Sequence, residues 1–358
     1  MTSMIPLPHR ILVVRLSAMG DVIHAMPAIA SLRRAKPDVQ IGWLIEERWA
    51  ELLCSRMTER MAPRSQLKPL ADWVHVANFT RWRRALSSAD TWRDIRLRIR
   101  DVRAMQYELA LDFQGSMRSA LAARASGAGV RVGSSQPREA PANMLYTRTI
   151  DPAGVHVVEQ ALSLASAVAG EDLEYIEPPF PLDPAHEAWA TDFIAKLDGK
   201  PFAILNPGAG WGAKCWPAES FGNVARALVE RGLAVVVNHG PGEEQLAKAV
   251  RASSGGVALP LKCSIGELIA LTHRAALFIG GDTGPMHLAA ALRVPVVALF
   301  GPTRPERNGP FGTRCVVLRS PDSVYNTSHI DRPDEGLVSI PPPAVIEAAE
   351  QLLGGRVA

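Results

Sequence analysis

The sequence predicts an α/β protein of two domains, each a doubly wound parallel sheet covered by helices. Three observations support this fold: the chain has 358 residues, strand-like and helix-like stretches alternate in both halves, and a proline-rich segment separates the halves. Because one hydrophobic core rarely extends beyond about 250 to 300 residues, this length favours two cores. We expect domains at residues 1–180 and 181–358.

The first half alternates between the two structural periods. The apolar run 11–16 is typical of a buried strand, whereas the apolar positions of 20–35 recur at helical spacing. An order of strand, helix and strand is typical of a parallel sheet wrapped by helices. Further strands are expected at 39–45, 109–113 and 129–133.

The segment 177–184 (EPPFPLDP) ends this pattern. Crowded prolines can neither continue a helix nor lie inside a central strand. We therefore place the domain boundary in this segment.

The second half repeats the alternation. Each strand leads into a turn and then a helix, and open parallel sheets bind ligands at the carboxyl ends of their strands. A last helix near 343–353 packs either within this domain or back on the first. The expected strands are 202–207, 233–240, a short one near Val257, 275–282 and 294–301, and the expected helices are 217–231, 243–252, 264–273 and 285–292.

Composition excludes several classes of protein. Hydrophobic residues make up 47% and charged residues 21% of the chain, as in an ordinary globular protein. No apolar run approaches the roughly 20 residues of a membrane span, and the sequence start lacks a signal-peptide pattern, so we expect a cytoplasmic protein. The four cysteines form no C-x-x-C pair and the nine histidines show no metal-binding spacing, which predicts reduced thiols and no metal site.

The charge is slightly uneven along the chain. Residues 1–180 hold 23 Lys and Arg against 19 Asp and Glu, whereas residues 181–358 hold 16 against 17. This small excess indicates an anionic partner for the first domain. It does not indicate nucleic-acid binding, which calls for a denser basic face.

A polar turn follows the first expected strand. Arg15, Ser17 and Asp21 lie at its carboxyl end, where an α/β domain opens to ligands. Asp21 has two interpretations: a cap for the N–H groups of the next helix, or a carboxylate for acid–base chemistry. The turn lacks the G-x-G-x-x-G spacing of dinucleotide-binding proteins, which argues against a dehydrogenase.

A second turn, GGDTG at 280–284, joins a strand to a helix. Its glycines let backbone N–H groups approach a ligand, and the start of the following helix favours an anion. His287 follows on the first helical turn. We predict a phosphate site here; the alternative is a structural turn capped by Asp282.

A glycine-rich loop, NPGAGWGAKCWP at 206–217, carries Lys214 beyond the end of another strand. A lysine at this position can act as a point charge on a departing diphosphate. The other interpretation is an ordinary solvated surface lysine.

These segments together resemble glycosyltransferase family 9, and within it the ADP-heptose:lipopolysaccharide heptosyltransferases, above all those of type I. The resemblance covers nearly the full length, from SAMGDVIHAMPA through DFQGSMRSAL, PREAP, KCWP and GPGEE to GGDTGPMHLAAALRVPVVALFGPT. It implies the GT-B architecture, in which two Rossmann-like domains face each other across a cleft. The first domain then binds the acceptor and the second binds ADP-heptose.

The resemblance also implies roles for individual residues. Asp21 matches the general base, with Arg15 and Ser17 beside it in the acceptor region. The implied donor-binding residues are Lys214, Glu244 or its neighbour Glu243, Asp282, Thr283, Gly284 and His287. The sequence departs from type I in its glycine-rich loop before Lys214 and in His239, which stands where a Trp is familiar, so type II stays open.

Residues 81–103 hold eight arginines and three aspartates. Trp92, Ile95, Ile99 and Val102 recur there at helical spacing, which predicts an amphipathic helix. One interpretation is a surface helix whose charges are solvated. The other, which the resemblance favours, is that arginines bind the anionic groups of the acceptor and the anionic face of the inner membrane.

The expected acceptor-binding residues extend along the first domain. Arg81, Arg83 and Arg84 are expected in a loop-like segment before the amphipathic helix. The remaining candidates are Asp112, Gln114, Arg118 and Arg138, for which the alternative is an ordinary capping or surface group.

The expected reaction is a single in-line displacement with inversion. Asp21 takes a proton from an acceptor hydroxyl, while Lys214 and His287 stabilise the departing ADP. The expected partners are ADP-heptose and a Kdo-lipid A acceptor, with no metal, no further cofactor and no nucleic acid. Three alternatives stay open: a type II enzyme, a GT-B transferase with a UDP-sugar or another acceptor, and a non-catalytic nucleotide-sugar binding protein.

Overall fold

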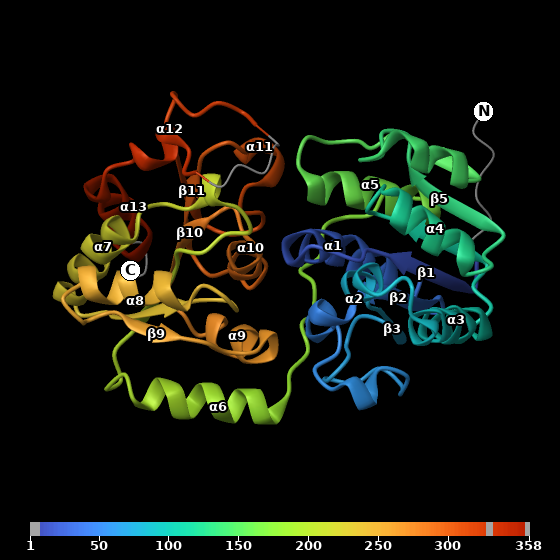
Figure 1. The fold of residues 1–358 in the computed structure, drawn as a ribbon, viewed down its shortest axis with the longest axis horizontal. Helices are drawn as coiled ribbons and strands as arrows, with labels where there is room; N and C mark the ends of the chain where they lie inside the picture. The colour runs from blue at the N-terminus through green and yellow to red at the C-terminus, as the bar shows by residue number, and fades with distance from the viewer. Residues whose placement is uncertain (1–7, 327–331, 355–358) are drawn as a thin grey trace. The chain divides into compact units, whose positions relative to one another are not determined.

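The computed structural model of the chain describes residues 8–326 and 332–354. Two compact units divide at Asp183 and Pro184 (Figure 1), three residues beyond the expected boundary. Residues 172–183, which include the proline-rich segment up to Asp183, form neither helix nor strand, and Pro184 begins α6. Proline removes a backbone donor and fixes φ, which explains the break.

The first unit contains a six-stranded sheet in the order β3-β2-β1-β4-β5-β6, with every neighbouring pair parallel. The order reverses between β1 and β4, which lie side by side at the centre. Ligands of such sheets bind outside the carboxyl ends of the strands at this point. The strands are β1 (Arg10–Val14), β2 (Gln40–Glu46), β3 (Trp73–Ala77), β4 (Leu109–Asp112), β5 (Val130–Ser134) and β6 (Arg148–Ile150).

Helices connect these parallel strands. On one face of the sheet, Leu12 and Val14 of β1 pack in a cluster with Trp82 and Val102 from two of the helices. The α-helices are α1 (Met19–Ala35), α2 (Phe79–Arg84), α3 (Ala89–Ala104), α4 (Met117–Ala125) and α5 (Val157–Ala169), and the 3-10 helices are η1 (Glu47–Leu52), η2 (Met57–Glu59) and η3 (Ala140–Leu145).

The second unit repeats the topology. Its sheet has the order β12-β11-β10-β7-β8-β9, again all parallel, with the reversal between β7 and β10. The strands are β7 (Phe202–Asn206), β8 (Ala234–Asn238), β9 (Leu259–Leu261), β10 (Leu277–Gly281), β11 (Val296–Phe300) and β12 (Cys315–Arg319). The helices are α6 (Pro184–Ala195), η4 (Gly212–Lys214), α7 (Ala218–Glu230), α8 (Glu244–Ser253), α9 (Ile265–Thr272), α10 (Gly284–Ala291), α11 (Pro305–Asn308), α12 (Glu335–Val338) and α13 (Pro342–Gly354).

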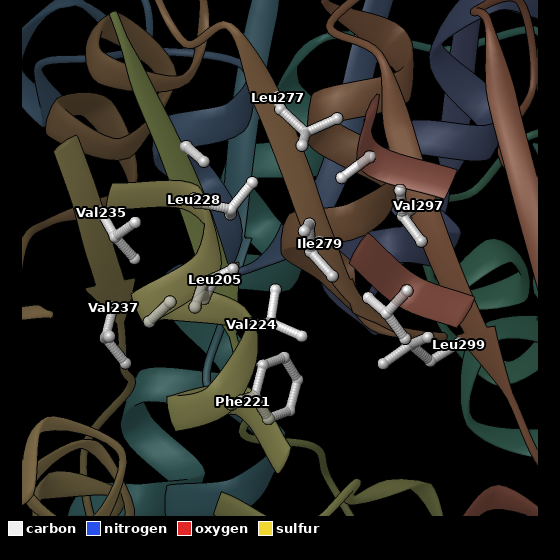
Figure 2. Packing of buried hydrophobic residues seen from close by; sticks show 14 of the residues in the cluster. Leu205, Phe221, Val224, Leu228, Val235, Val237, Leu277, Ile279, Val297 and Leu299 are labelled. Atoms are coloured by element: carbon white, nitrogen blue, oxygen red, sulfur yellow. The ribbon is translucent and has the colours of Figure 1, made fainter. Parts of the chain in front are cut away.

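Alternate residues of the second sheet face two separate cores, because successive side chains of a strand point to opposite faces. Leu277 and Ile279 of β10 pack with Phe221 and Val224 of α7, as Figure 2 shows. Phe278, between them in sequence, packs in the other core with residues of α9 and α10. Burial on both faces explains the nearly continuous apolar runs that the sequence shows.

The last helix, α13, packs within the second unit, against α7 and the strands β10, β11 and β12. Its residues Val345 and Leu352 are buried in the same core as α7. Helix α13 is therefore part of the core of the second unit.

The prediction of two doubly wound α/β units is confirmed. The short strand expected near Val257 lies at Leu259–Leu261. Arg81, Arg83 and Arg84 lie on α2 and not in a loop, since Phe79 and Trp82, three residues apart, give this segment an apolar face. Across the described ranges 8–326 and 332–354, every helix is too short or too polar to cross a membrane.

Candidate active site

The turn between β1 and α1 is fixed by the neighbouring turn after β4. The side-chain oxygen of Gln114 accepts hydrogen bonds from the backbone N–H groups of Leu16 (2.9 Å) and Ser17 (3.3 Å). Its amide nitrogen donates to Ser116 Oγ. Gln114 is buried, so both ends of its side chain support the turn.

Asp21 caps α1 and remains half exposed. One carboxylate oxygen accepts a hydrogen bond from the backbone N–H of Ala18 (3.1 Å), and the other lies 2.8 Å from Arg15 Nη2. The side chain of Asp21 is 40% exposed, whereas that of Arg15 is 13% exposed. The capping role is thus present, and the carboxylate is still open to a ligand.

Arg15 joins the two turns. Its guanidinium donates to the backbone carbonyl of Phe113, after β4, as well as to that of Asp21. The predicted residues Arg15, Ser17 and Asp21 therefore lie together at the carboxyl ends of β1 and β4, where the strand order reverses.

Arg118 on α4 reaches the same turn. Its Nη2 lies 3.4 Å from Ser17 Oγ, and its Nη1 lies 3.4 Å from Glu46 Oε1. The guanidinium also lies over the ring of Phe79, 5.2 Å from the ring centre. Glu46 is a buried carboxylate that the sequence analysis missed, because a single Glu at the end of β2 carries no motif.

Asp112, the last residue of β4, supports the turn that follows this strand. Its carboxylate accepts hydrogen bonds from Tyr146 Oη (2.7 Å) and from the backbone N–H of Gln114 (2.8 Å). Complete burial raises the pKa of Asp112 despite these hydrogen bonds.

Arg138 is the remaining predicted residue near this edge. It is exposed, and its backbone nitrogen packs so closely on Gly115 that a Cβ added there would lie 2.9 Å away. Gly115 has φ +65°, a value that also favours glycine. The loop that carries Arg138 is thus held beside the turn after β4.

The second unit gathers three predicted residues into one cluster. Lys214 Nζ lies 2.6 Å from Asp282 Oδ2, and His287 Nε2 lies 3.1 Å from Asp282 Oδ1. Burial alone would raise the pKa of Asp282, but the hydrogen bond with His287 and the charge of Lys214 outweigh it and hold the pKa well below its usual range. Asp282 is therefore ionised and orients both partners.

The start of α10 lies beside this cluster. Thr283 is the N-cap residue of α10, and Thr283 to Pro285 are partly exposed. Within the described residues, the backbone N–H groups of Thr283 and Gly284 donate no hydrogen bond. Such N–H groups at a helix start form a site for an anion.

Two asparagines that the sequence analysis did not single out tie the strand ends together. Asn238 Nδ2 donates to Asn206 Oδ1 (2.7 Å), and Asn206 Nδ2 donates to the carbonyl of Gly208 (2.9 Å). Asn206 also contacts Thr283 Oγ1 at 3.4 Å. This network fixes the loop after β7 against the turn after β10.

Glu243 and Glu244 both lie at the start of α8 but face different neighbours. Glu244 pairs with Lys262 (3.0 Å), and hydrogen bonds from its own backbone N–H and from Lys262 lower its pKa. Glu243 accepts a hydrogen bond from Gly240 N–H and packs on Gly208, where an added Cβ would lie 2.2 Å from the carboxylate. Glu243 is thus the acidic residue in contact with the loop after β7.

Among residues 8–326 and 332–354, no three His, Cys, Asp or Glu side chains gather into a group that could hold a metal ion. The ionisable groups of both turns are instead paired with each other or with backbone groups.

Known proteins are similar to this chain in sequence and in fold. The model of glycosyltransferase family 9 (heptosyltransferase) matches residues 95–336. Lipopolysaccharide heptosyltransferase 1 of Pseudomonas aeruginosa is 31% identical over 87% of this chain and 84% of its own length. The structure of E. coli heptosyltransferase WaaC with ADP is 25% identical, covers 96% of this chain and 99% of that one, and has a TM-score of 0.77. The same enzyme with ADP-2-deoxy-2-fluoro heptose gives a TM-score of 0.73 at 25% identity.

Proposed function

The chain belongs to glycosyltransferase family 9, the heptosyltransferases, and we propose that it transfers heptose from ADP-heptose to the Kdo region of the lipopolysaccharide inner core, as a type I enzyme. Its two doubly wound units have the GT-B fold. The observation that supports the donor most directly is the Lys214, Asp282 and His287 cluster beside the start of α10.

The second unit binds the diphosphate of the donor. Lys214 supplies a positive charge, and the N–H groups of Thr283 and Gly284 supply hydrogen bonds to phosphate oxygens. Asp282 is itself an anion, so it positions Lys214 and His287 and does not contact the phosphates. As the bond to the sugar breaks, negative charge grows on the departing ADP, and these groups stabilise it.

The first unit binds the acceptor and activates its hydroxyl group. Asp21 accepts the hydroxyl proton, and the oxygen then attacks the anomeric carbon from the face opposite ADP, which inverts the configuration. Arg15 holds the carboxylate of Asp21 in place through the 2.8 Å contact. Ser17, Arg118 and Arg138 lie around the same turn and bind the anionic sugar. The exposed arginines of α2 add positive charge for the acceptor phosphates and for the inner-membrane surface.

The transfer needs no metal ion, because Lys214 and the helix-start N–H groups already supply the charge that the leaving group requires. Enzyme treated with a chelator should keep its full rate. Loss of activity that added Mg²⁺ restores would contradict this part of the proposal.

The decisive experiment supplies ADP-heptose and a panel of truncated lipopolysaccharide cores and weighs the products by mass spectrometry. We expect one heptose to be added to the core that ends in Kdo. Addition only to a core that already carries heptose would favour a type II enzyme. Stabilisation by UDP but not by ADP in a thermal-shift assay would contradict the donor.

A further inference from the structure

A cavity of about 400 Å³ lies in the first unit, between α3 and α4. It opens near the carboxyl ends of β2 and β3, where Leu44 and Ala77 contribute to its lining. Its size falls within the roughly 300 to 1,000 Å³ that ligand pockets occupy. The lining is mostly apolar and includes Trp82, Ile95, Ile99 and Ala122.

Arg118 belongs both to this cavity and to the candidate acceptor turn. It lines the cavity beside Phe79, and its guanidinium contacts Ser17 Oγ. If the polar part of a ligand lies at Ser17, an adjoining apolar part of the same ligand can therefore enter the cavity.

The charges around the cavity indicate an anionic molecule. Arg98, in the lining, pairs with Asp94 at 3.3 Å. The side chains of five exposed arginines of α2 and α3 make no ion pair or hydrogen bond within the described part of the chain: Arg81, Arg83, Arg84, Arg96 and Arg100. Two large apolar side chains nearby, Trp92 on α3 and Leu121 on α4, are about half exposed. Two arginines in the lining of an apolar cavity, with further arginines on the helices that bound it, match an amphiphile with an anionic head and a hydrocarbon chain.

We propose that this cavity holds one acyl chain of the lipid acceptor, while the arginines bind its anionic head. The proposal rests on the proposed function and extends it from the sugar to the lipid. Each methylene buried in an apolar site contributes about 0.8 kcal/mol, or roughly fourfold in affinity. The acyl chain thus raises the affinity for the acceptor and leaves the chemical step unchanged.

The first test compares acylated and fully deacylated Kdo-lipid A as acceptors in detergent solution. Ala122→Phe fills the cavity, and Ile99→Gln makes its wall polar. We expect each variant to raise the KM for the acylated acceptor on the order of tenfold, with kcat and the KM for the deacylated acceptor unchanged. Ala104→Phe, on the exposed end of α3 outside the cavity, is the matched control and should behave as the parent protein.

Several outcomes would overturn the proposal. An equal rise of KM for both acceptors would mean that the variants disturb the unit as a whole, and circular dichroism would check this. If Ala122→Phe binds phosphatidylglycerol vesicles more weakly while the ratio of the KM values for the acylated and deacylated acceptors stays unchanged, the cavity holds membrane lipid. A dimer that this variant dissociates would assign it to a second copy of the chain.

A second test does not depend on heptose transfer. Dodecyl phosphate, below its micelle concentration, should bind the full chain with one-to-one stoichiometry in calorimetry. Decyl phosphate, two methylenes shorter, should bind on the order of tenfold more weakly, and Ala122→Phe should abolish both signals. Equal binding of dodecyl and decyl phosphate would overturn the acyl site. If the enzyme binds dodecyl phosphate but transfers heptose to neither acceptor, only the proposed function is overturned.

Discussion

The ammonium group of Lys214 lies 2.6 Å from the carboxylate of Asp282, and the two side chains are 14% and 7% exposed. A charge pair this well shielded is strong because little water competes for either group. Lys214 is thereby held at the start of α10 before any donor arrives, and the cost of ordering a flexible side chain upon binding is lower.

Replacement of Lys214 tests this arrangement. Lys214→Ala should weaken ADP binding roughly tenfold to a hundredfold, because a hydrogen bond to a charged group contributes about 1.5 to 3 kcal/mol. Isothermal calorimetry with ADP measures the change. Lys248→Ala, an exposed lysine on α8, is the matched control; equal ADP affinity in the two variants would remove Lys214 from the donor site.

Replacement of Asp21 separates catalysis from binding. Asp21→Asn should lower kcat by about 10² to 10⁴, the usual contribution of a general base. Asparagine keeps a side-chain oxygen that can accept the hydrogen bond from the Ala18 N–H, so the turn should stay in place and ADP affinity should change little. Asp38→Asn, at an exposed site after α1, serves as the control, and turnover within twofold of the parent enzyme would exclude Asp21 as the base.

The buried side chain of Gln114 positions the turn by accepting hydrogen bonds from the N–H groups of Leu16 and Ser17. Gln114→Ala should leave the N–H groups of Leu16 and Ser17 without their acceptor, at a cost of about 1 to 3 kcal/mol in the free energy of unfolding. It should also lower kcat while ADP affinity in the second unit stays constant. Urea denaturation and steady-state kinetics measure both effects, with Gln245→Ala, exposed on α8, as the control. A loss of stability with unchanged kcat would show that the turn tolerates the change.

His75 should make the stability of the first unit depend on pH. Burial lowers its pKa from 6.5 to about 4, and its Nε2 lies 2.7 Å from Tyr107 Oη. The folded protein thus binds fewer protons than the unfolded chain between these values, so the stabilisation is fully present above about pH 6.5 and is lost as the pH falls towards 4. The loss is on the order of 3 kcal/mol.

The comparison of His75→Gln with the parent protein isolates this contribution. In urea denaturation, the difference in free energy of unfolding between the parent and His75→Gln should shrink by that amount from pH 7.5 to pH 4. The same difference between the parent and His9→Gln, at an exposed position, should stay constant. A difference in free energy of unfolding between the parent and His75→Gln that does not change with pH would contradict this prediction.

The sequence was sufficient to predict the fold because the central strands carry a clear signal. Apolar runs such as Ile11 to Val14 and Leu277 to Ile279 are fully buried, and turns with glycine or polar residues follow them. Edge strands carry less of this signal. β3, which begins at Trp73 and contains the buried polar residue His75, was not predicted, because a histidine interrupts its apolar run.

Long-range contacts explain what the sequence could not show. Lys68 is fully buried, with its ammonium donating to the backbone carbonyls of Ala62, Ala71 and Asp72, although lysine is among the residue types most often exposed. The contact of Glu46 with Arg118 joins residues 72 positions apart. Motifs placed Asp21 and Asp282 at strand ends, but only the strand order shows that both turns follow strands next to the reversal point.

Residues 79–104, which carry α2 and α3, connect the border strand β3 to the central strand β4 and contribute no strand to the sheet. Exchange of this segment therefore leaves the hydrogen-bond ladder of the sheet intact. A chimaera that takes residues 79–104 from a relative should therefore inherit that relative's preference among sugar-lipids and retain its own nucleotide selectivity. This layout would let acceptor choice diverge between organisms while the chemistry of transfer stays the same.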